Sequence, residues 1–254
     1  MPIKQSICLP MIKNCGIEMK DLVAELAKIG FAAIEIWGPG DDLEDLVGYA
    51  RDNKLAFASM VGGGDLNDAS KHDEKEKALR DAIDLAVKHG IPGLITLSGN
   101  TIEGQPTEKS QENCAAILKK VAPYAEEKGV NLNLELLNSK VNHPGYECDH
   151  TAWGVKVCEM VGSPRVKLLY DIYHMQIMEG DVIRTIRDNI KHIGHFHTAG
   201  NPGRNDLDDF QELNYTGICR AIAETGYDLY VAHEFKPKGD CLSAIKQAWE
   251  LCNV

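Results

Sequence analysis

The sequence predicts an α/β fold, a single (β/α)8 barrel that spans residues 1–254 as one domain. Three observations lead to this prediction. The length of 254 residues is close to the roughly 250 residues typical of such a barrel. Apolar, strand-like runs alternate with amphipathic helical stretches along the whole chain. Helix-to-strand connections are short and several strand-to-helix connections are long, as expected where one barrel face carries the functional loops.

The elements follow one another in eight strand-helix pairs. We expect strands at 5–10, 32–37, 55–60, 93–98, 131–137, 166–172, 191–198 and 227–235. We expect helices at roughly 19–29, 43–52, 74–88, 109–128, 150–161, 181–189, 214–225 and 241–252. Five helices are predicted to stop at a glycine that adopts the left-handed conformation, namely Gly30, Gly90, Gly129, Gly162 and Gly226. The loop at 61–73 contains a glycine run, 62–64, that predicts a mobile lid.

Composition narrows the class of protein. The chain has 27 Lys and Arg against 38 Asp and Glu, and a net charge of −11 disfavours a nucleic acid partner. The eight cysteines are scattered without a Cys-x-x-Cys pair, which predicts reduced, packing thiols of a cytosolic protein and no zinc knuckle. We expect no signal peptide and no membrane span, and therefore a cytoplasmic protein. Whether it forms a homo-oligomer is left open.

Four strand-like segments each end in a side chain that can bind a divalent metal: Glu135, Asp171, His197 and Glu234. The intervals of 36, 26 and 37 residues each correspond to about one strand-helix unit. Parallel neighbouring strands would bring all four side chains to the same end of the barrel. Buried carboxylates repel one another unless a cation neutralises them, so a metal site is favoured over a structural polar layer.

The ligand types indicate which metal to expect. Three carboxylates and one imidazole favour one Mn²⁺ or Mg²⁺ ion, with Co²⁺ as an alternative, over a structural Zn²⁺. Strand alternation also directs Glu35 and Trp37 inward on the second strand, where they are candidates for the pocket wall. His195 lies deeper, and its role is open between supporting a ligand and filling the core.

Two motifs carry a resemblance to a known family. They are Tyr170-Asp171-Ile-Tyr-His174-Met-Gln176 and Gly194-His-x-His197-x-Ala-Gly-Asn-Pro-Gly203-Arg204, and the chain resembles hydroxypyruvate isomerases within the xylose isomerase-like TIM-barrel superfamily of sugar isomerases and epimerases. The resemblance implies metal ligands at the four residues above, acid/base roles for Glu135 and Glu234, and substrate contacts from His174 and Arg204. The sequence departs from the pattern at His197, where hydroxypyruvate isomerases tend to have Gln and ketose epimerases have His.

The hypothesis is a metal-dependent aldose-ketose type isomerase that converts hydroxypyruvate into tartronate semialdehyde through an enediolate. Glu234 is the expected carbon base and Glu135 its partner, and Arg204, then Lys236, are candidates for the substrate carboxylate. The first alternative is a ketose 3-epimerase acting on a free monosaccharide. An endonuclease IV-like repair enzyme is disfavoured because residues 205–213 contain no histidine. The third alternative is a sugar-binding or regulatory barrel without catalytic activity. The expected partner is a small hydroxy-keto acid or sugar.

Overall fold

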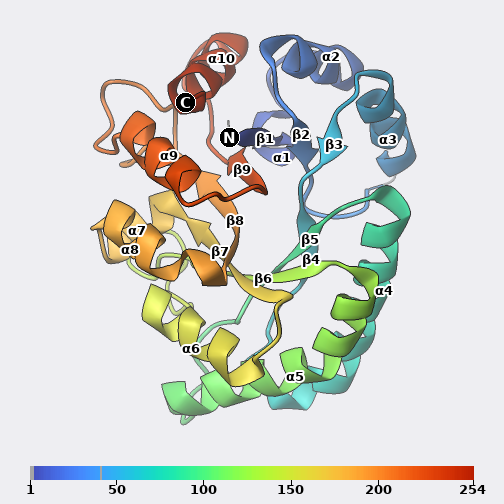
Figure 1. Ribbon diagram of the computed structural model, residues 1–254, viewed down its shortest axis with the longest axis vertical. Helices are drawn as coiled ribbons and strands as arrows, with labels where there is room; N and C mark the ends of the chain where they lie inside the picture. The colour runs from blue at the N-terminus through green and yellow to red at the C-terminus, as the bar shows by residue number, and fades with distance from the viewer. Residues whose placement is uncertain (1–2, 41) are drawn as a thin grey trace.

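The computed structural model describes residues 3–40 and 42–254, and within them nine parallel strands form one sheet in the order β3-β2-β1-β9-β8-β7-β6-β5-β4. The strands are β1 Lys4–Cys8, β2 Ala33–Glu35, β3 Ala56–Phe57, β4 Met60–Gly63, β5 Gly93–Thr96, β6 Asn131–Glu135, β7 Val166–Asp171, β8 Ile193–Thr198 and β9 Tyr230–His233. Helices surround the sheet, as Figure 1 shows. The predicted α/β barrel is confirmed.

The third predicted strand is split into β3 and β4, and this split explains why nine strands make an eight-unit barrel. β3 pairs with β2, whereas β4 pairs with β5. Between them, Ala58 donates its N–H to the Ile34 carbonyl at 2.8 Å, and Ser59 accepts from the Ile36 N–H at 3.3 Å. The two edges of the sheet are therefore consecutive pieces of one extended segment, and the ring closes through the chain itself.

The predicted lid at residues 62–64 takes a different form in the structure. Gly62 and Gly63 belong to β4 and line up along β5. A Cβ atom at Gly62 would lie 3.0 Å from the Cβ of Leu94, so the glycine allows β4 to pack closely against its neighbour. Two of the three glycines of the predicted lid, Gly62 and Gly63, are thus part of the barrel wall, and Gly64 follows the strand.

The long helices match the predicted stretches to within a few residues. Their bounds are α2 Met19–Ile29, α3 Leu43–Asp52, α4 His72–His89, α5 Thr107–Lys128, α6 Thr151–Val161, α8 Val182–Asn189, α9 Tyr215–Glu224 and α10 Cys241–Cys252. The five predicted glycine stops all have positive φ, between 68° and 117°. Four short helices were not predicted: α1 Leu9–Ile12, α7 Ile172–Met178 and the 3-10 helices Ala69–Lys71 and Ile190–His192.

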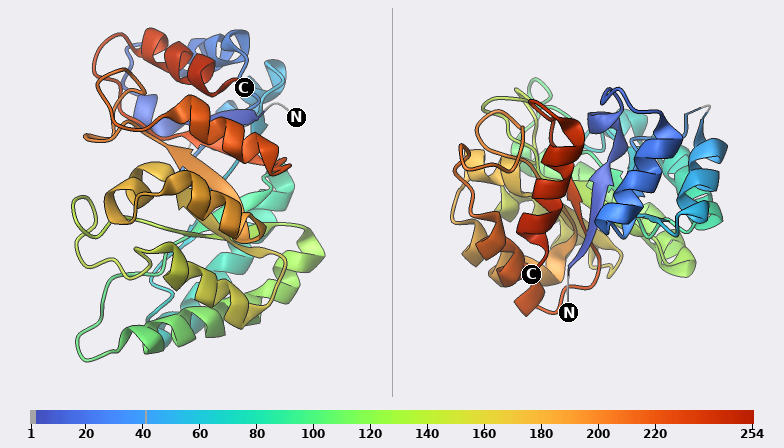
Figure 2. Two further views of the ribbon diagram at one scale, coloured as in Figure 1. Left: turned by 60° about the vertical axis from the view of Figure 1, so that its left-hand side comes forward. Right: turned by 90° about the horizontal axis from the view of Figure 1, so that it is seen from above.

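The strand-to-helix loops gather at one end of the barrel. In both views of Figure 2 the long loops, including 138–149 and 199–213, project from the side opposite the N mark. Because the strands are parallel, this is the end at which β6, β7, β8 and β9 finish. Two exposed hydrophobic side chains, Val141 and Phe210, lie on these loops. The predicted asymmetry between the two faces is thus present in the fold.

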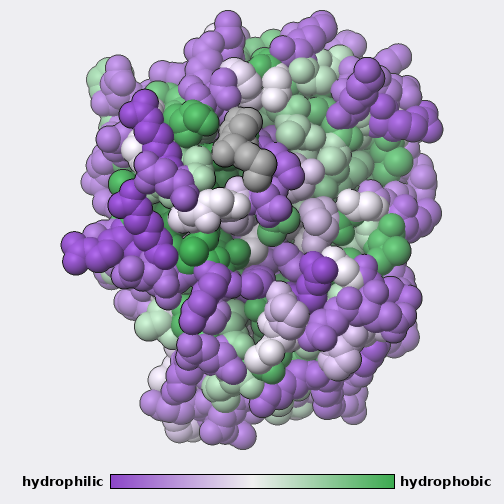
Figure 3. Space-filling model, in the orientation of Figure 1, coloured by the Kyte–Doolittle hydropathy of each residue, from purple (hydrophilic) through white to green (hydrophobic). Residues whose placement is uncertain are grey.

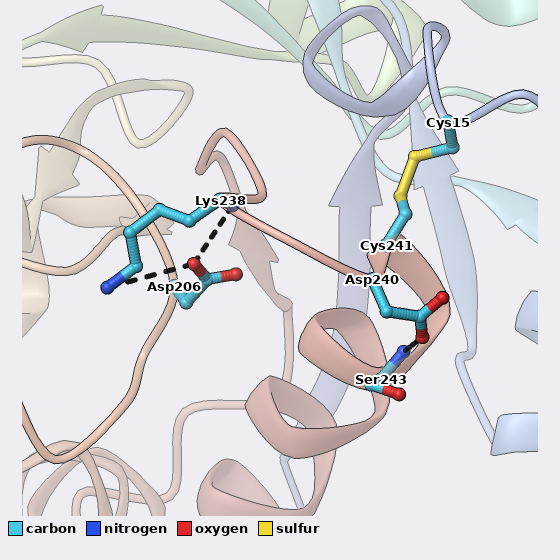
Figure 4. Close-up of a disulfide and its surroundings, with 6 residues drawn as sticks. All are labelled: Cys15, Asp206, Lys238, Asp240, Cys241 and Ser243. Atoms are coloured by element: carbon cyan, nitrogen blue, oxygen red, sulfur yellow. Dashed lines mark hydrogen bonds and ion pairs between the residues drawn. A yellow bond between two sulfur atoms is a disulfide. The ribbon is translucent and has the colours of Figure 1, made fainter.

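One pair of cysteines departs from the sequence-based expectation. Cys15 and Cys241 form a disulfide with a Cα–Cα distance of 5.7 Å, which ties the segment after α1 to the start of α10 (Figure 4). The prediction that all eight cysteines are reduced is wrong for these two, because ring closure brings together residues 226 positions apart. The six free cysteines are buried, as expected for packing thiols: Cys8, Cys114, Cys148, Cys158, Cys219 and Cys252.

The exposed surface is mostly hydrophilic on the face that Figure 3 shows. On the face seen in Figure 3, hydrophilic side chains cover most of the surface and hydrophobic ones form separate patches between them. Within the residues that the structure describes, no helix has both the length and the apolar character needed to cross a membrane.

Candidate metal centre

The four predicted ligands converge at the carboxyl ends of four adjacent strands, β6 to β9, which lie side by side in Figure 1. The pairing aligns Asp171 with His197, and Glu234 follows β9 directly with its N–H bonded to the Thr198 carbonyl at 2.9 Å. All four are buried, with exposed fractions of 7% for Glu135, 1% for Asp171, 1% for His197 and 4% for Glu234. The parallel register therefore builds the predicted cluster.

The distances within the cluster suit a single ion. Each residue offers one ligand atom, and all four atoms lie within 4.8 Å of one another. From His197 Nδ1, the distances are 3.0 Å to Glu234 Oε2, 3.7 Å to Glu135 Oε1 and 3.8 Å to Asp171 Oδ2. Ligand atoms around an ion at bond lengths of about 2.0–2.1 Å stand roughly 3–4 Å apart, so the residues present fit such an ion.

Burial and mutual repulsion perturb the carboxylates of the cluster. Burial, with the neighbouring charges of Glu234 and Asp171, raises the pKa of Glu135 to about 8. Burial also raises the pKa of Asp171 to about 6, against the opposing charges of His197 and Arg204. Burial acts in the same sense on Glu234, but the charge and hydrogen bond of His197 lower its pKa. Three carboxylates thus share too little positive charge, which is the condition a bound cation relieves.

The short helix α7 places His174 beside the cluster. Asp171 caps this helix by accepting the His174 N–H at 3.1 Å. The His174 ring is fully buried, and its Nδ1 accepts the backbone N–H of Asn138 at 3.1 Å. The proton of the neutral ring must then sit on Nε2, which is 3.6 Å from Asp171 Oδ2 and has no hydrogen-bond partner among the described residues. Burial lowers the pKa of His174 well below its usual value, so the ring is a neutral donor.

Arg204 reaches the cluster from the loop after β8. Its guanidinium contacts the Glu234 carboxylate. Burial alone would lower the pKa of Arg204, but the negative charges of Glu234 and Asp171 outweigh burial and raise it. The backbone of Arg204 has φ +57°. An antiparallel β-bridge between Gly200 and Asn205 closes its loop, and the Lys236 N–H donates to the Arg204 carbonyl. A Cβ atom at Gly200 would meet the Asp206 carbonyl oxygen at 2.2 Å, so only glycine permits this turn.

Glu35 faces inward at the end of β2, as predicted, and lies on the side of the His197 ring opposite the three carboxylates. It is fully buried below the His197 ring, with Oε1 2.9 Å from His197 Nε2 and Oε2 2.6 Å from His195 Nε2. Burial alone would raise its pKa, but the charges and hydrogen bonds of His197 and His195 hold it well below the usual value. The ring of His197 lies between Glu35 and the three carboxylates, and the pocket-wall role of Glu35 remains a prediction.

The remaining predicted contacts lie further out. Trp37 is 49% exposed and, with Leu9 and Pro10, lines a cavity of about 210 Å³ beside the end of β2. Lys236 is exposed and contributes backbone bonds to the loop of Arg204. Both remain predictions as substrate contacts.

Sequence reasoning missed His143 as a member of this neighbourhood. Its ring lies edge-on to His174 at 5.2 Å, and its Nε2 is buried without a hydrogen-bond partner among the described residues. Burial, and then the positive charge of Arg204, lower its pKa. Its position on the long loop that follows Glu135 is the one signal that could have identified it.

The chain belongs to the xylose isomerase-like TIM barrel family, whose sequence model matches residues 23–250. It is 30% identical over 225 residues to hydroxypyruvate isomerase of Escherichia coli strain K12, and the match covers 84% of this chain and 85% of that protein. It is 33% identical over 137 residues to 2-oxo-tetronate isomerase of Cupriavidus necator, with 52% of each chain covered. The resemblance to hydroxypyruvate isomerases seen in the motifs is confirmed.

A solved structure extends the comparison to the fold. The crystal structure of an AP endonuclease, family 2, from Brucella melitensis superposes with a TM-score of 0.87 and 24% sequence identity, covering 96% of this chain and 97% of that one. At this identity the likeness is one of fold, so it carries no conclusion about activity on nucleic acid.

Proposed function

We propose that this protein is a metal-dependent isomerase that interconverts hydroxypyruvate and tartronate semialdehyde. The observation that supports it most is the convergence of Glu135, Asp171, His197 and Glu234 within 4.8 Å, next to a buried arginine. The E. coli and C. necator relatives are both named as isomerases of small keto acids. A chain with this site and these relatives is best understood as an isomerase.

The two glutamates are suited to opposite tasks. Without an ion, the pKa of Glu234 is lowered and that of Glu135 is raised to about 8, so the surroundings of the two carboxyls give them different proton affinities. Two carboxyls whose pKa values are separated in this way can serve as base and acid. Glu234 takes the proton from C3 of hydroxypyruvate and returns it to C2. Glu135 takes the proton of the C3 hydroxyl and gives it to the C2 oxygen.

The ion would be held by Glu135, Asp171, His197 and Glu234, and it would supply positive charge beside the enediolate oxygens. The protein supplies the remaining recognition. His174 presents the Nε2–H to the site, and Arg204 presents a cation that pairs with a carboxylate. A cation and a hydrogen-bond donor beside the carboxylates suit a substrate whose carboxylate is bonded directly to the reacting carbonyl carbon, as in hydroxypyruvate.

A ketose 3-epimerase on a free monosaccharide is the second candidate, and one observation favours it. The imidazole of His197 stands where characterised hydroxypyruvate isomerases tend to have Gln and ketose epimerases have His. The same acids and ion could move a proton at C3 of a longer sugar. The two candidates differ in the substrate's far end, a carboxylate in one case and a hydroxylated chain in the other.

Substrate conversion separates the two. The purified chain is incubated with Mn²⁺ and hydroxypyruvate, then with Mn²⁺ and fructose or tagatose, and the products are identified by NMR. We expect conversion of hydroxypyruvate to tartronate semialdehyde, lost when EDTA replaces Mn²⁺. Epimerised sugar with unchanged hydroxypyruvate would replace the first candidate by the second.

A further inference from the structure

His197 is held between two sets of acidic groups on opposite edges of its ring. The Nδ1 edge faces the carboxylates of Glu135, Asp171 and Glu234 at 3.0–3.8 Å. The Nε2 edge faces Glu35 Oε1 at 2.9 Å. His197 Nδ1 is hydrogen-bonded to Glu234 Oε2 at 3.0 Å. Glu35 Oε1 and His197 Nε2 are both buried, and among the described residues neither has a well-aligned hydrogen bond, not even to the other. Their contact at 2.9 Å nevertheless places a carboxylate oxygen directly against this ring nitrogen.

Glu35 reaches the His197 imidazole from a strand that is not adjacent to the strand of His197 in the barrel. It ends β2, which is separated from β8 by β1 and β9. Small residues allow the approach, because Ala232 is the partner of His197 on β9 and Cys8 is the partner of Glu35 on β1. The second oxygen of Glu35 is fixed by His195 Nε2 at 2.6 Å. The contact with His195 thus holds the Glu35 carboxylate in one orientation.

We propose that Glu35, clamped by His195, is a positioning residue that decides which nitrogen of His197 binds the ion. This inference rests on the metal site of the proposed function. A carboxylate accepts hydrogen bonds and donates none, so it requires the ring proton on Nε2. The lone pair of Nδ1 is then directed at the three carboxylates and the ion between them. Carboxylates that orient metal-bound histidines in this way are a general feature of metal sites.

The same contact also prevents the flipped ring. A half-turn of the imidazole about its Cβ–Cγ bond would move Nε2 off Glu35 and leave a buried carboxylate without that partner, which is costly. Glutamine at position 35 would keep the volume but could present its NH2 group to the ring. The substitution Glu35→Gln therefore no longer fixes which nitrogen of His197 binds the ion, and it changes the packing little.

The test measures metal binding rather than turnover. Mn²⁺ affinity is determined by calorimetry, and the visible spectrum of bound Co²⁺ reports the ligand geometry, for the full-length wild type and Glu35→Gln. We expect Mn²⁺ binding to weaken by about 10- to 100-fold, as for other outer-shell partners, with an altered Co²⁺ spectrum. The matched control is Glu147→Gln, which removes a buried carboxylate bonded to Thr107 and Ser110. It should bind Mn²⁺ like the wild type.

A second measurement uses the wild type alone and stands even where Glu35→Gln does not fold. In Mg²⁺-loaded protein with ¹⁵N-labelled histidine, the His197 signals, assigned by their loss in His197→Gln, should show a proton on Nε2. A proton on Nδ1 would overturn the inference. Wild-type affinity and spectrum in Glu35→Gln would overturn it as well while leaving the proposed function intact. A wild type that binds no divalent ion would instead overturn both.

Discussion

The two edges of the His197 ring carry similar residues but balance their charges in different ways. On one edge, Glu135, Asp171 and Glu234 share His197 and Arg204, and the pKa values of two of these carboxyls are raised. On the other edge, Glu35 lies between two imidazoles and its pKa is lowered. The first set, which we call the carboxylate edge, has unmatched negative charge and needs a cation. On the second, the Glu35 edge, a single carboxylate has both of its oxygens against imidazole nitrogens, at 2.6 Å and 2.9 Å.

The largest effect is expected from substitutions on the carboxylate edge. Glu135→Gln and Glu234→Gln each keep the side-chain volume but remove a proton-transfer group and a metal ligand. We expect kcat to fall by about 10²–10⁴-fold or more in each variant, because general acid-base catalysis alone contributes that much. Steady-state assays with hydroxypyruvate and Mn²⁺ measure it, with Glu147→Gln as the control. Wild-type turnover in either variant would contradict the paired-carboxylate scheme.

A smaller effect is expected at Arg204, the cation of the carboxylate edge. Arg204→Met keeps much of the length and removes the charge that is proposed to bind the substrate carboxylate. Loss of one charge-assisted contact of about 1.5–3 kcal/mol should raise KM for the keto acid by roughly 10- to 100-fold.

The control for Arg204 is Lys238→Met, because Lys238 is an exposed cation paired with Asp208 on the adjacent segment. It should have wild-type KM. An Arg204→Met enzyme with wild-type KM would show that the substrate carboxylate is bound by other groups, Lys236 first among them.

The most modest effect concerns pH and sharpens the contrast between the two edges. Without metal, the folded pKa of Glu135 is about 8 and that of Asp171 about 6, both above their values in the unfolded chain. These two carboxyls therefore bind more protons in the folded protein than in the unfolded chain between about pH 4 and 8, so their contribution to the free energy of unfolding should fall as pH rises through this window.

Urea unfolding of EDTA-treated protein at several pH values measures this dependence. Saturating Mg²⁺ should remove most of it, because the ion takes over the balance of charge. Equal pH dependence with and without Mg²⁺ would show that these carboxyls are not the ligands.

The residues at the strand ends could be predicted because they depend on the local sequence pattern and on the order of the strands along the chain. Apolar runs at regular spacing place Glu135, Asp171, His197 and Glu234 at the same end of neighbouring parallel strands, and chain order alone sets that adjacency. The helix stops were predicted for a similar reason, since a left-handed residue at a helix end favours glycine.

Features that depend on distant contacts could not be predicted. Glu35 and His195 are 160 residues apart, and only closure of the ring brings β2 within reach of β8. The disulfide between Cys15 and Cys241 has the same origin. The helix α7 was missed because its start depends on the Asp171 side chain acting as a cap, while the surrounding residues continue an apolar strand-like pattern.

Crystals of the wild-type protein grown with Mn²⁺, and measured for anomalous scattering at the manganese edge, test the central claim most directly. The account predicts one manganese ion bonded to Glu135, Asp171 and Glu234 and to the Nδ1 atom of His197, with Glu35 against Nε2. A manganese ion bound away from these four side chains, or no bound manganese at saturating concentration, would contradict it.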